Sequence, residues 1–210
     1  MDEDIQQPQP APEKLTLPDV IKAVFTDYVG FAERHLKGPN PPAMLVAVWL
    51  IGMDAVAGGI ELENVLGQRS AVQDWFHIWI RIMVGGTAAG ALRYWLAGSL
   101  FHVLVLGAGG KGPARTSRYI FLYAALPVSV VDLSVKVVQM LVYGNGYFAG
   151  RTNAALEGVF ATLMLGAFAY TLILCYRGMR TLMEADRRRS IAILAAVTAG
   201  MIAFMIIATR

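Results

Sequence analysis

The segment Tyr119–Tyr143, YIFLYAALPVSVVDLSVKVVQMLVY, decides the fold of this chain. A helix of roughly 20 predominantly apolar residues crosses a hydrocarbon core of about 30 Å, and this segment is long and apolar enough to do so. Its only charged residues are Asp132 and Lys136. The sequence therefore predicts a membrane-spanning helix here, and the two charges inside it require partners.

Four further apolar segments have a comparable length and cover residues 42–60, 79–106, 156–177 and 190–208. Hydrophobic residues make up 56% of the chain and charged residues 16%, whereas about a quarter of the residues of a soluble domain are charged. We therefore predict an all-α, polytopic membrane protein. Its five transmembrane helices form one domain over residues 42–208.

The basic residues between the apolar segments predict the orientation in the membrane. One side holds Lys14, Lys22, Arg34, Lys37, Lys111, Arg115, Arg118, Arg177, Arg180, Arg187, Arg188 and Arg189. The other side holds only Arg69, Arg151 and Arg210. Because Lys and Arg in short loops favour the cytoplasmic side, we expect the N-terminus in the cytoplasm and the C-terminus outside.

The region before the first span divides into two parts. Residues 1–14 are acidic and proline-rich, and this composition predicts a disordered tail. Residues 15–37 predict a cytoplasmic amphipathic helix, with Thr16 as its N-cap and Asp19 three residues later. Apolar residues recur along one face: Leu17, Ile21, Val24, Phe25, Tyr28 and Phe31. We predict an interfacial helix on the cytoplasmic leaflet; packing against the bundle's own cytoplasmic loops is an equally good interpretation.

Small residues in the second span predict close helix packing. Gly86 and Gly90 stand at GxxxG spacing, which allows two helix backbones to approach each other in lipid. We favour packing inside the bundle over self-dimerisation through this face.

The segment Gly107–Arg118, GAGGKGPARTSR, contains a GxGxxG motif. A dinucleotide site needs a strand before this motif and a helix opening directly after it, but here a predicted membrane span precedes it and Pro113 follows. We therefore predict a flexible basic turn that contacts anionic lipid headgroups. The contact residues are Lys111, Arg115 and Arg118, together with Arg187, Arg188 and Arg189 of the next basic joint.

The sequence lacks the common motifs of catalysis and metal binding. It has no HExxH, no GxSxG and a single cysteine, Cys175, which suits packing inside a span. The three histidines, His35, His77 and His102, lie at different predicted depths. We predict a non-enzymatic protein without catalytic residues, metal, cofactor or nucleic-acid partner.

The charges inside the predicted spans need partners, because each costs about 2.5–3.5 kcal/mol at a helix centre. Matching depths predict a network of Asp54, Arg93, Asp132 and Lys136 that pairs Arg93 with Asp132 and Asp54 with Lys136. Asp132 and Lys136 can also pair directly, at i and i+4 of one helix. We favour a lock on helix register; a polar pathway or ligand site is the alternative.

Pro127 lies inside the third span, five residues before Asp132. A proline removes one backbone hydrogen bond and clashes with the carbonyl at position i−4, here that of Tyr123. We predict a helix kink, and we favour a structural kink over a gating hinge.

The arrangement of these features is similar to that of the Yip1-domain family of polytopic membrane proteins, in its bacterial form. An amphipathic lead-in precedes five spans, and LGAGGKGPARTSRYIFLYAALP joins a glycine-rich basic loop to a span with Tyr123 and Pro127. YRGMRTLMEADRRRSIAIL resembles the family's basic turn before its last helix. The resemblance covers residues 18–208 and implies this fold, a bacterial inner (cytoplasmic) membrane location and no settled activity.

Two functions fit these expectations. The first is a non-enzymatic scaffold that organises partner membrane proteins or lipids. The alternative is a small transporter or channel that uses the intramembrane charges, and an enzyme acting on lipid is more distant. The lipid bilayer is the expected partner; other membrane proteins or a second copy of the chain are further candidates.

Overall fold

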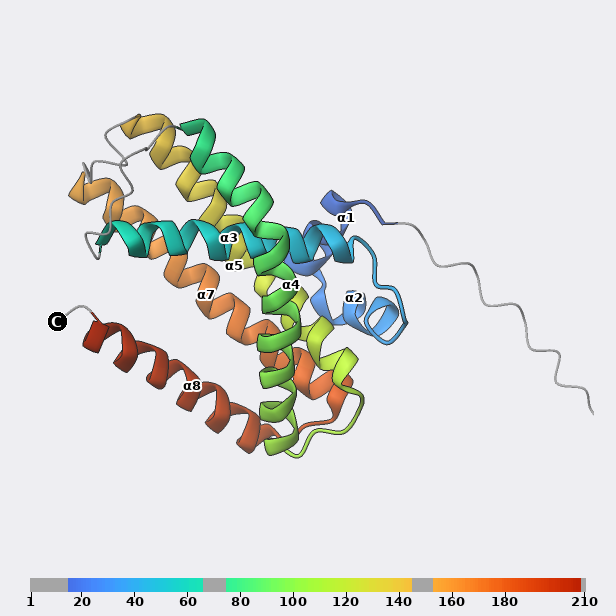
Figure 1. The fold of residues 1–210 in the computed structure, drawn as a ribbon. Coiled ribbons are helices and arrows are strands. Elements are labelled where there is room, and N and C mark those ends of the chain that lie inside the picture. The colour runs from blue at the N-terminus through green and yellow to red at the C-terminus, as the bar shows by residue number, and fades with distance from the viewer. Residues whose placement is uncertain (1–14, 66–74, 145–152, 209–210) are drawn as a thin grey trace, which may run out of the picture.

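The computed structural model describes residues 15–65, 75–144 and 153–208 (Figure 1). In order along the chain, these residues form the helices α1 (Leu17–Thr26), α2 (Tyr28–His35), α3 (Met44–Val65), α4 (Trp75–Gly107), α5 (Ala114–Tyr143), α7 (Ala154–Met183) and α8 (Arg187–Ala208). The all-α prediction is confirmed for the described part of the chain. The predicted disordered tail, residues 1–14, lies outside it.

Three of the described helices are long and apolar enough to cross a membrane. They are Phe76–Gly107 in α4, Ala114–Tyr143 in α5 and Ala155–Met183 in α7. The apolar part of α3 is shorter, Met44–Ile60. The five apolar segments of the sequence thus fall on α3, α4, α5, α7 and α8.

Helix α5 is the central helix of the bundle. It packs against α3, α4 and α7, and α1 covers part of it. Of its apolar window, 61% is buried inside the protein, compared with 28% for α4 and 17% for α7. It continues as one helix through Pro127, which is itself buried. Because protein surrounds α5, the polar side chains it carries must find partners on neighbouring helices.

Helices α3 and α4 cross at glycines. A Cβ atom on Gly52 would overlap the Gly86 carbonyl oxygen, and a Cβ atom on Gly90 would overlap the Val48 carbonyl oxygen. Gly86 itself faces the backbone of Met53, whose N atom lies 3.0 Å from the position of a Cβ. The predicted glycine face therefore packs inside the bundle, and Gly52 is its counterpart on α3.

The amphipathic region is two helices rather than one. It breaks at Asp27, which has φ −144° and ψ 63°. The Asp27 side chain accepts a hydrogen bond from the Gly30 N–H at 3.1 Å, and so caps α2. The apolar spacing runs unbroken across Asp27, and for this reason the sequence pattern alone predicted a single helix.

The apolar side of α1 and α2 covers the bundle. Val20, Val24 and Phe31 are fully buried, and Tyr28 is nearly so. Phe31 makes an edge-on contact with Tyr123 of α5, at 5.2 Å between ring centroids. This arrangement supports the second sequence interpretation, in which the segment packs against the protein itself.

Helix α8 is attached to the bundle mainly by its first turns. It begins beside the end of α4 and then runs away from the other helices, as Figure 1 shows. Its contacts are with α7 and α4. Apolar residues along it stay exposed, among them Ile191, Met201 and Ile202. This surface must face lipid or another protein.

Candidate functional site

Charged side chains from three helices meet beside the glycine crossing. Arg93 of α4 donates from Nη1 to the Asp54 carboxylate of α3 at 2.9 Å, and to the Ile51 carbonyl oxygen at 3.0 Å. Ser129 of α5 donates to the same Asp54 oxygen at 2.9 Å. Asp54 thus links α3, α4 and α5 through one carboxylate oxygen.

The second ion pair of the cluster lies along α5. Lys136 binds Asp132, as the i,i+4 spacing allows, and its side chain is only 5% exposed. Asp132 stands one turn after Ser129, which binds Asp54, so the two ion pairs are neighbours. The four charges form one connected cluster with no net charge, which limits the cost of placing them in lipid.

The pairing differs from the one that the sequence suggested. Arg93 pairs with Asp54, so the predicted pair of Arg93 with Asp132 is wrong. The direct i,i+4 pair of Asp132 with Lys136, which the sequence also allowed, is present. The glycine crossing explains the difference. Asp54 stands two residues after Gly52, and Arg93 stands three residues after Gly90, so the crossing brings these two side chains together.

The polar stripe of α5 extends further than the predicted cluster. Gln139 donates to the two oxygens of Glu157 on α7, at 3.2 Å each, and the Tyr143 hydroxyl donates to Glu157 at 3.4 Å. These partners were not predicted from the sequence. A signal was present: Ser129, Asp132, Lys136, Gln139 and Tyr143 recur at spacings of three and four residues, the period of one helix face.

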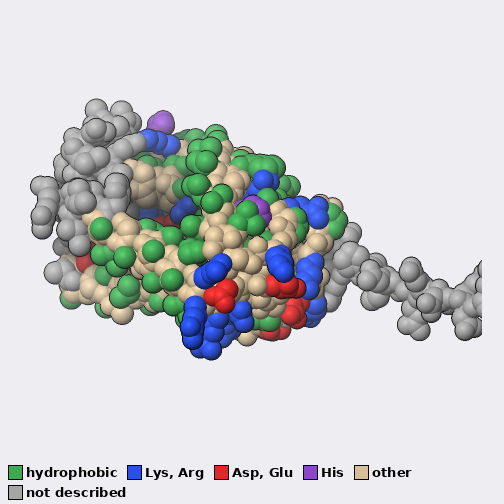
Figure 2. All heavy atoms as spheres, turned by 90° about the horizontal axis from the view of Figure 1, so that it is seen from below, with side chains coloured by type: hydrophobic (Ala, Val, Ile, Leu, Met, Phe, Trp, Pro, Cys, Tyr) green, Lys and Arg blue, Asp and Glu red, His purple; other side chains and the backbone are tan. Residues whose placement is uncertain are grey.

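The basic segments meet at one end of the bundle. The Lys111 N–H donates to the Met183 carbonyl oxygen at 2.6 Å, and the Asp186 N–H donates to the Ala108 carbonyl oxygen at 2.9 Å. The predicted flexible turn after α4 is therefore fastened to the turn between α7 and α8. Figure 2 views this end and shows Lys and Arg side chains gathered on it, with a few acidic ones between them.

The predicted lipid-contact residues have different surroundings at this end. Five of them are exposed: Lys111, Arg115, Arg187, Arg188 and Arg189. Arg118 instead packs its guanidinium over the Trp95 ring, 4.1 Å from the centroid, and its stem contacts Gly98 of α4. Arg118 therefore joins α5 to α4 through a cation–π contact.

Asp186 organises the turn before α8. Its carboxylate accepts a hydrogen bond from the Arg189 N–H at 2.9 Å. This bond and the neighbouring backbone and arginine groups lower the pKa of Asp186 below its ordinary value. Arg180 adds a second tie, from its Nη1 to the Ala185 carbonyl oxygen at 2.6 Å.

Comparison with known proteins identifies the family. A family model described as Yip1 domain matches residues 22–209. The chain belongs to the Yip1 domain family. No curated protein and no solved structure matches it. Family membership and the three long apolar helices make this Yip1-domain protein an integral membrane protein.

The structure gives a physical role to the tyrosines of the resembling segment in this Yip1-domain protein. The Tyr123 hydroxyl donates to the Pro42 carbonyl oxygen at 2.5 Å, and the Tyr119 hydroxyl donates to the Pro39 carbonyl oxygen at 2.8 Å. Both bonds fasten the proline-rich entry of α3 to α5. The entry has few backbone N–H groups of its own, so these tyrosine donors fix its path.

Proposed function

We propose that this Yip1-domain protein is a non-enzymatic scaffold that organises partner membrane proteins or lipids. The observation that carries the proposal is the basic end of the bundle. Five exposed cations stand on the turn after α4 and on the first turns of α5 and α8, and backbone hydrogen bonds join these two connections into one surface. A fixed positive surface beside apolar helices attracts anionic headgroups and acidic juxtamembrane segments.

The proposed topology has five membrane spans, α3, α4, α5, α7 and α8, in a bacterial inner (cytoplasmic) membrane. The basic end faces the cytoplasm, and so does the N-terminus, while the C-terminus lies outside. The excess of Lys and Arg on that side supports this orientation. The charged outer side of α1 and α2, with Lys22 and Arg34 exposed, then lies at the level of the cytoplasmic headgroups.

Lipid enrichment tests the scaffold directly. The protein is extracted from its native membrane in polymer nanodiscs, and the co-extracted lipids and proteins are quantified by mass spectrometry. We expect enrichment of anionic lipid or a reproducible companion protein with the wild type, and its loss when Arg187, Arg188 and Arg189 are all changed to Gln. The variant with Lys22 and Arg34 changed to Gln is the control, because it removes exposed cations from another surface. Bulk lipid composition and no companion with the wild type would contradict the proposal.

Transport is the second candidate function, and the buried charge cluster favours it. A cluster of paired carboxylates and cations inside the bilayer is typical of ion and proton pathways. Flux of protons and small cations into proteoliposomes is compared between the wild type and Asp132→Asn. Flux that the variant abolishes would favour transport over scaffolding. Equal flux in both proteins would show that Asp132 takes no part in a transport pathway.

A further inference from the structure

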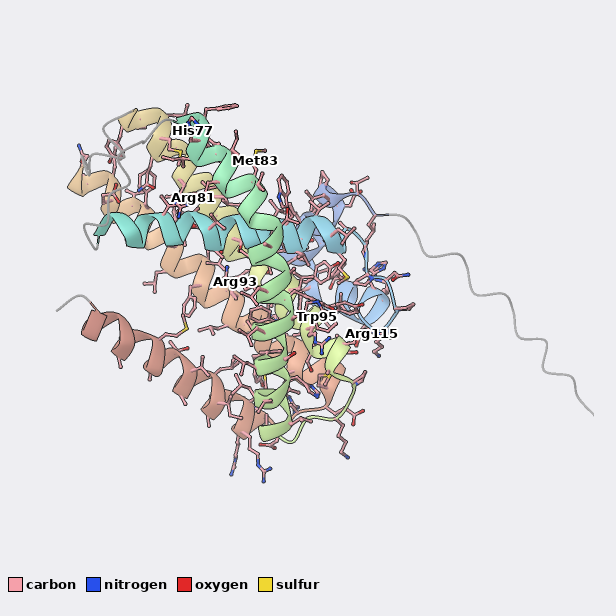
Figure 3. The ribbon with its side chains drawn as sticks, in the orientation of Figure 1. His77, Arg81, Met83, Arg93, Trp95 and Arg115 are labelled. Atoms are coloured by element: carbon pink, nitrogen blue, oxygen red, sulfur yellow. The ribbon has the colours of Figure 1, made fainter. Side chains whose placement is uncertain are left out.

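A groove opens beside Arg93 on the flank of α3 and α4. Its volume is about 600 Å³. It is lined by Asp54, Ala55 and Gly58 from α3, and by Ala89, Leu92, Arg93, Leu96, Ala97 and Leu100 from α4. Figure 3 places Arg93 in the angle between these two helices. The groove therefore combines apolar walls with one ion pair.

The guanidinium of Arg93 has an edge that the protein leaves unused. Both bonds to Ile51 and Asp54 come from Nη1, and Nε and Nη2 make no hydrogen bond within the described ranges of the chain. The side chain is 38% exposed, whereas Asp54 is 13% exposed. Nε and Nη2 point the same way in a planar guanidinium and bind two oxygen atoms, or one oxygen twice. This edge and the groove together form a site for an oxygen acceptor.

The depth of Arg93 in the membrane restricts the kind of ligand that can reach it. Arg93 lies 17 residues from Phe76 and 14 from Gly107, the ends of the apolar part of α4. At 1.5 Å per residue these separations are about 26 Å and about 21 Å. An acceptor bound at Arg93 therefore sits deep in the hydrocarbon region, far below the phosphates of the surrounding lipids.

The charge balance of the cluster restricts the charge of the ligand. Arg93, Asp54, Asp132 and Lys136 already sum to zero, so a bound anion would leave one uncompensated charge in lipid. A neutral group with carbonyl or ester oxygens satisfies the donors without that cost. The leucines of α4 then contact its hydrocarbon tail.

We propose that the α3–α4 groove binds a neutral lipid, whose carbonyl or ester oxygens accept hydrogen bonds from Nε and Nη2 of Arg93 and whose tail lies along Leu92, Leu96 and Leu100. Diacylglycerols and lipophilic quinones share this chemistry. The site does not depend on the scaffold function, because its residues are separate from the basic end of the bundle.

Photo-cross-linking tests the site in the full chain reconstituted in nanodiscs. The probe is a diacylglycerol with a photoreactive group on one acyl chain, and peptide mass spectrometry locates the label. We expect label on α3 and α4 residues of the groove. Unlabelled dioleoylglycerol or decylubiquinone should compete with the probe, and the stronger competitor identifies the preferred head group. Competition by oleate or phosphatidylglycerol alone would overturn the choice of a neutral ligand.

Three variants separate the groove from general lipid contact. Ala97→Trp fills the groove, and Arg93→Lys keeps the charge and the Asp54 partner but removes the planar edge. Both should lower labelling about tenfold, a loss of about 1.4 kcal/mol in binding. Ala91→Trp is the matched control, because Ala91 is exposed on the same helix outside the groove. Equal labelling in all three variants, with unchanged thermal stability, would overturn the proposal.

Discussion

At the scale of single residues, Arg93 holds two helices together through one nitrogen atom. Its partner Asp54 is 13% exposed and also receives the Ser129 hydroxyl. Removing one member of a partly buried ion pair leaves the other uncompensated, so the cost exceeds the value of the pair itself. The loss of stability on removing one partner, compared with the loss on removing both, therefore measures the pairing.

A double-mutant cycle on Arg93 and Asp54 should show strong coupling. We expect Arg93→Ala and Asp54→Ala each to lower the free energy of unfolding by about 3–5 kcal/mol, because each leaves a charge without its partner. The double variant should recover about 1–3 kcal/mol of the summed loss. Unfolding by SDS titration measures all three. A cycle on Arg93 and Asp132 is the control, and larger coupling there would show that the pairing is wrong.

The sequence predicted which charges gather but not how they pair. Depth along a helix follows from counting residues, and this placed Arg93 at the depth of Asp132, and Asp54 at the depth of Lys136 one turn further along. Pairing depends on how each helix is rotated about its axis. That rotation is set by the contact of Gly52 with α4, which no pattern around Gly52 revealed.

Asp186 makes the stability of the protein depend on pH. Its pKa is lowered in the folded protein, so its carboxylate contributes stability above the ordinary value of 3.8 and loses it as pH falls through the folded value. Asp186→Asn keeps the cap but cannot titrate. We expect the wild type to lose thermal stability relative to this variant as the pH falls below about 4. Melting temperatures of both proteins, measured in parallel, check this; curves that stay parallel would contradict it.

At the scale of helices, the α3–α4 crossing sets the architecture of the bundle. Two backbones touch where Gly52, Gly86 and Gly90 lie, and this close approach in turn places the ion pair and the groove. The sequence predicted the GxxxG face on α4 and the C-terminal end of α5, because both have strong local patterns, whereas α5 begins at Ala114, five residues before the predicted span. It missed the break between α1 and α2, since the capping contact of Asp27 interrupts no hydrophobic spacing.

Substitution of Gly52, at the helix crossing, should destabilise the protein far more than substitution of a glycine with open space around it. Gly52→Leu is expected to lower the free energy of unfolding by about 3 kcal/mol, because the new side chain would overlap the backbone of α4. Gly59→Ala, on the same helix with open space around it, should raise it by about 0.5–1 kcal/mol. Thermal unfolding monitored by tryptophan fluorescence ranks the two variants. A similar loss in both would mean that the crossing adds nothing.

At the scale of the whole molecule, the basic residues of two separate joints form one surface. Charge counting placed these joints on the same side of the membrane, but it could not place them side by side. That proximity comes from backbone hydrogen bonds of Lys111 and Asp186, which residue type does not encode. The same bonds explain why a glycine-rich turn has a defined path.

Accessibility of single cysteines checks the proposed topology. In a Cys175→Ala background, Lys111→Cys and Arg188→Cys should react with a membrane-impermeant maleimide in inverted vesicles and not in intact cells. Arg210→Cys should show the opposite behaviour, because the C-terminus is expected outside. Labelling of Lys111→Cys and Arg188→Cys from opposite sides would contradict the shared surface, and labelling of all three from one side would contradict five spans.

The bonds between the two turns also have a consequence for biosynthesis. The ribosome completes the turn after α4 long before it makes Met183 and Asp186, which bind that turn in the finished protein. The Lys111 N–H and the Ala108 carbonyl therefore gain these partners only after α7 and the start of α8 have been made. Synthesis of α7 and the start of α8 thus completes the basic end of the bundle, and a nascent chain that stops short of Met183 lacks the bonds that fix the turn after α4.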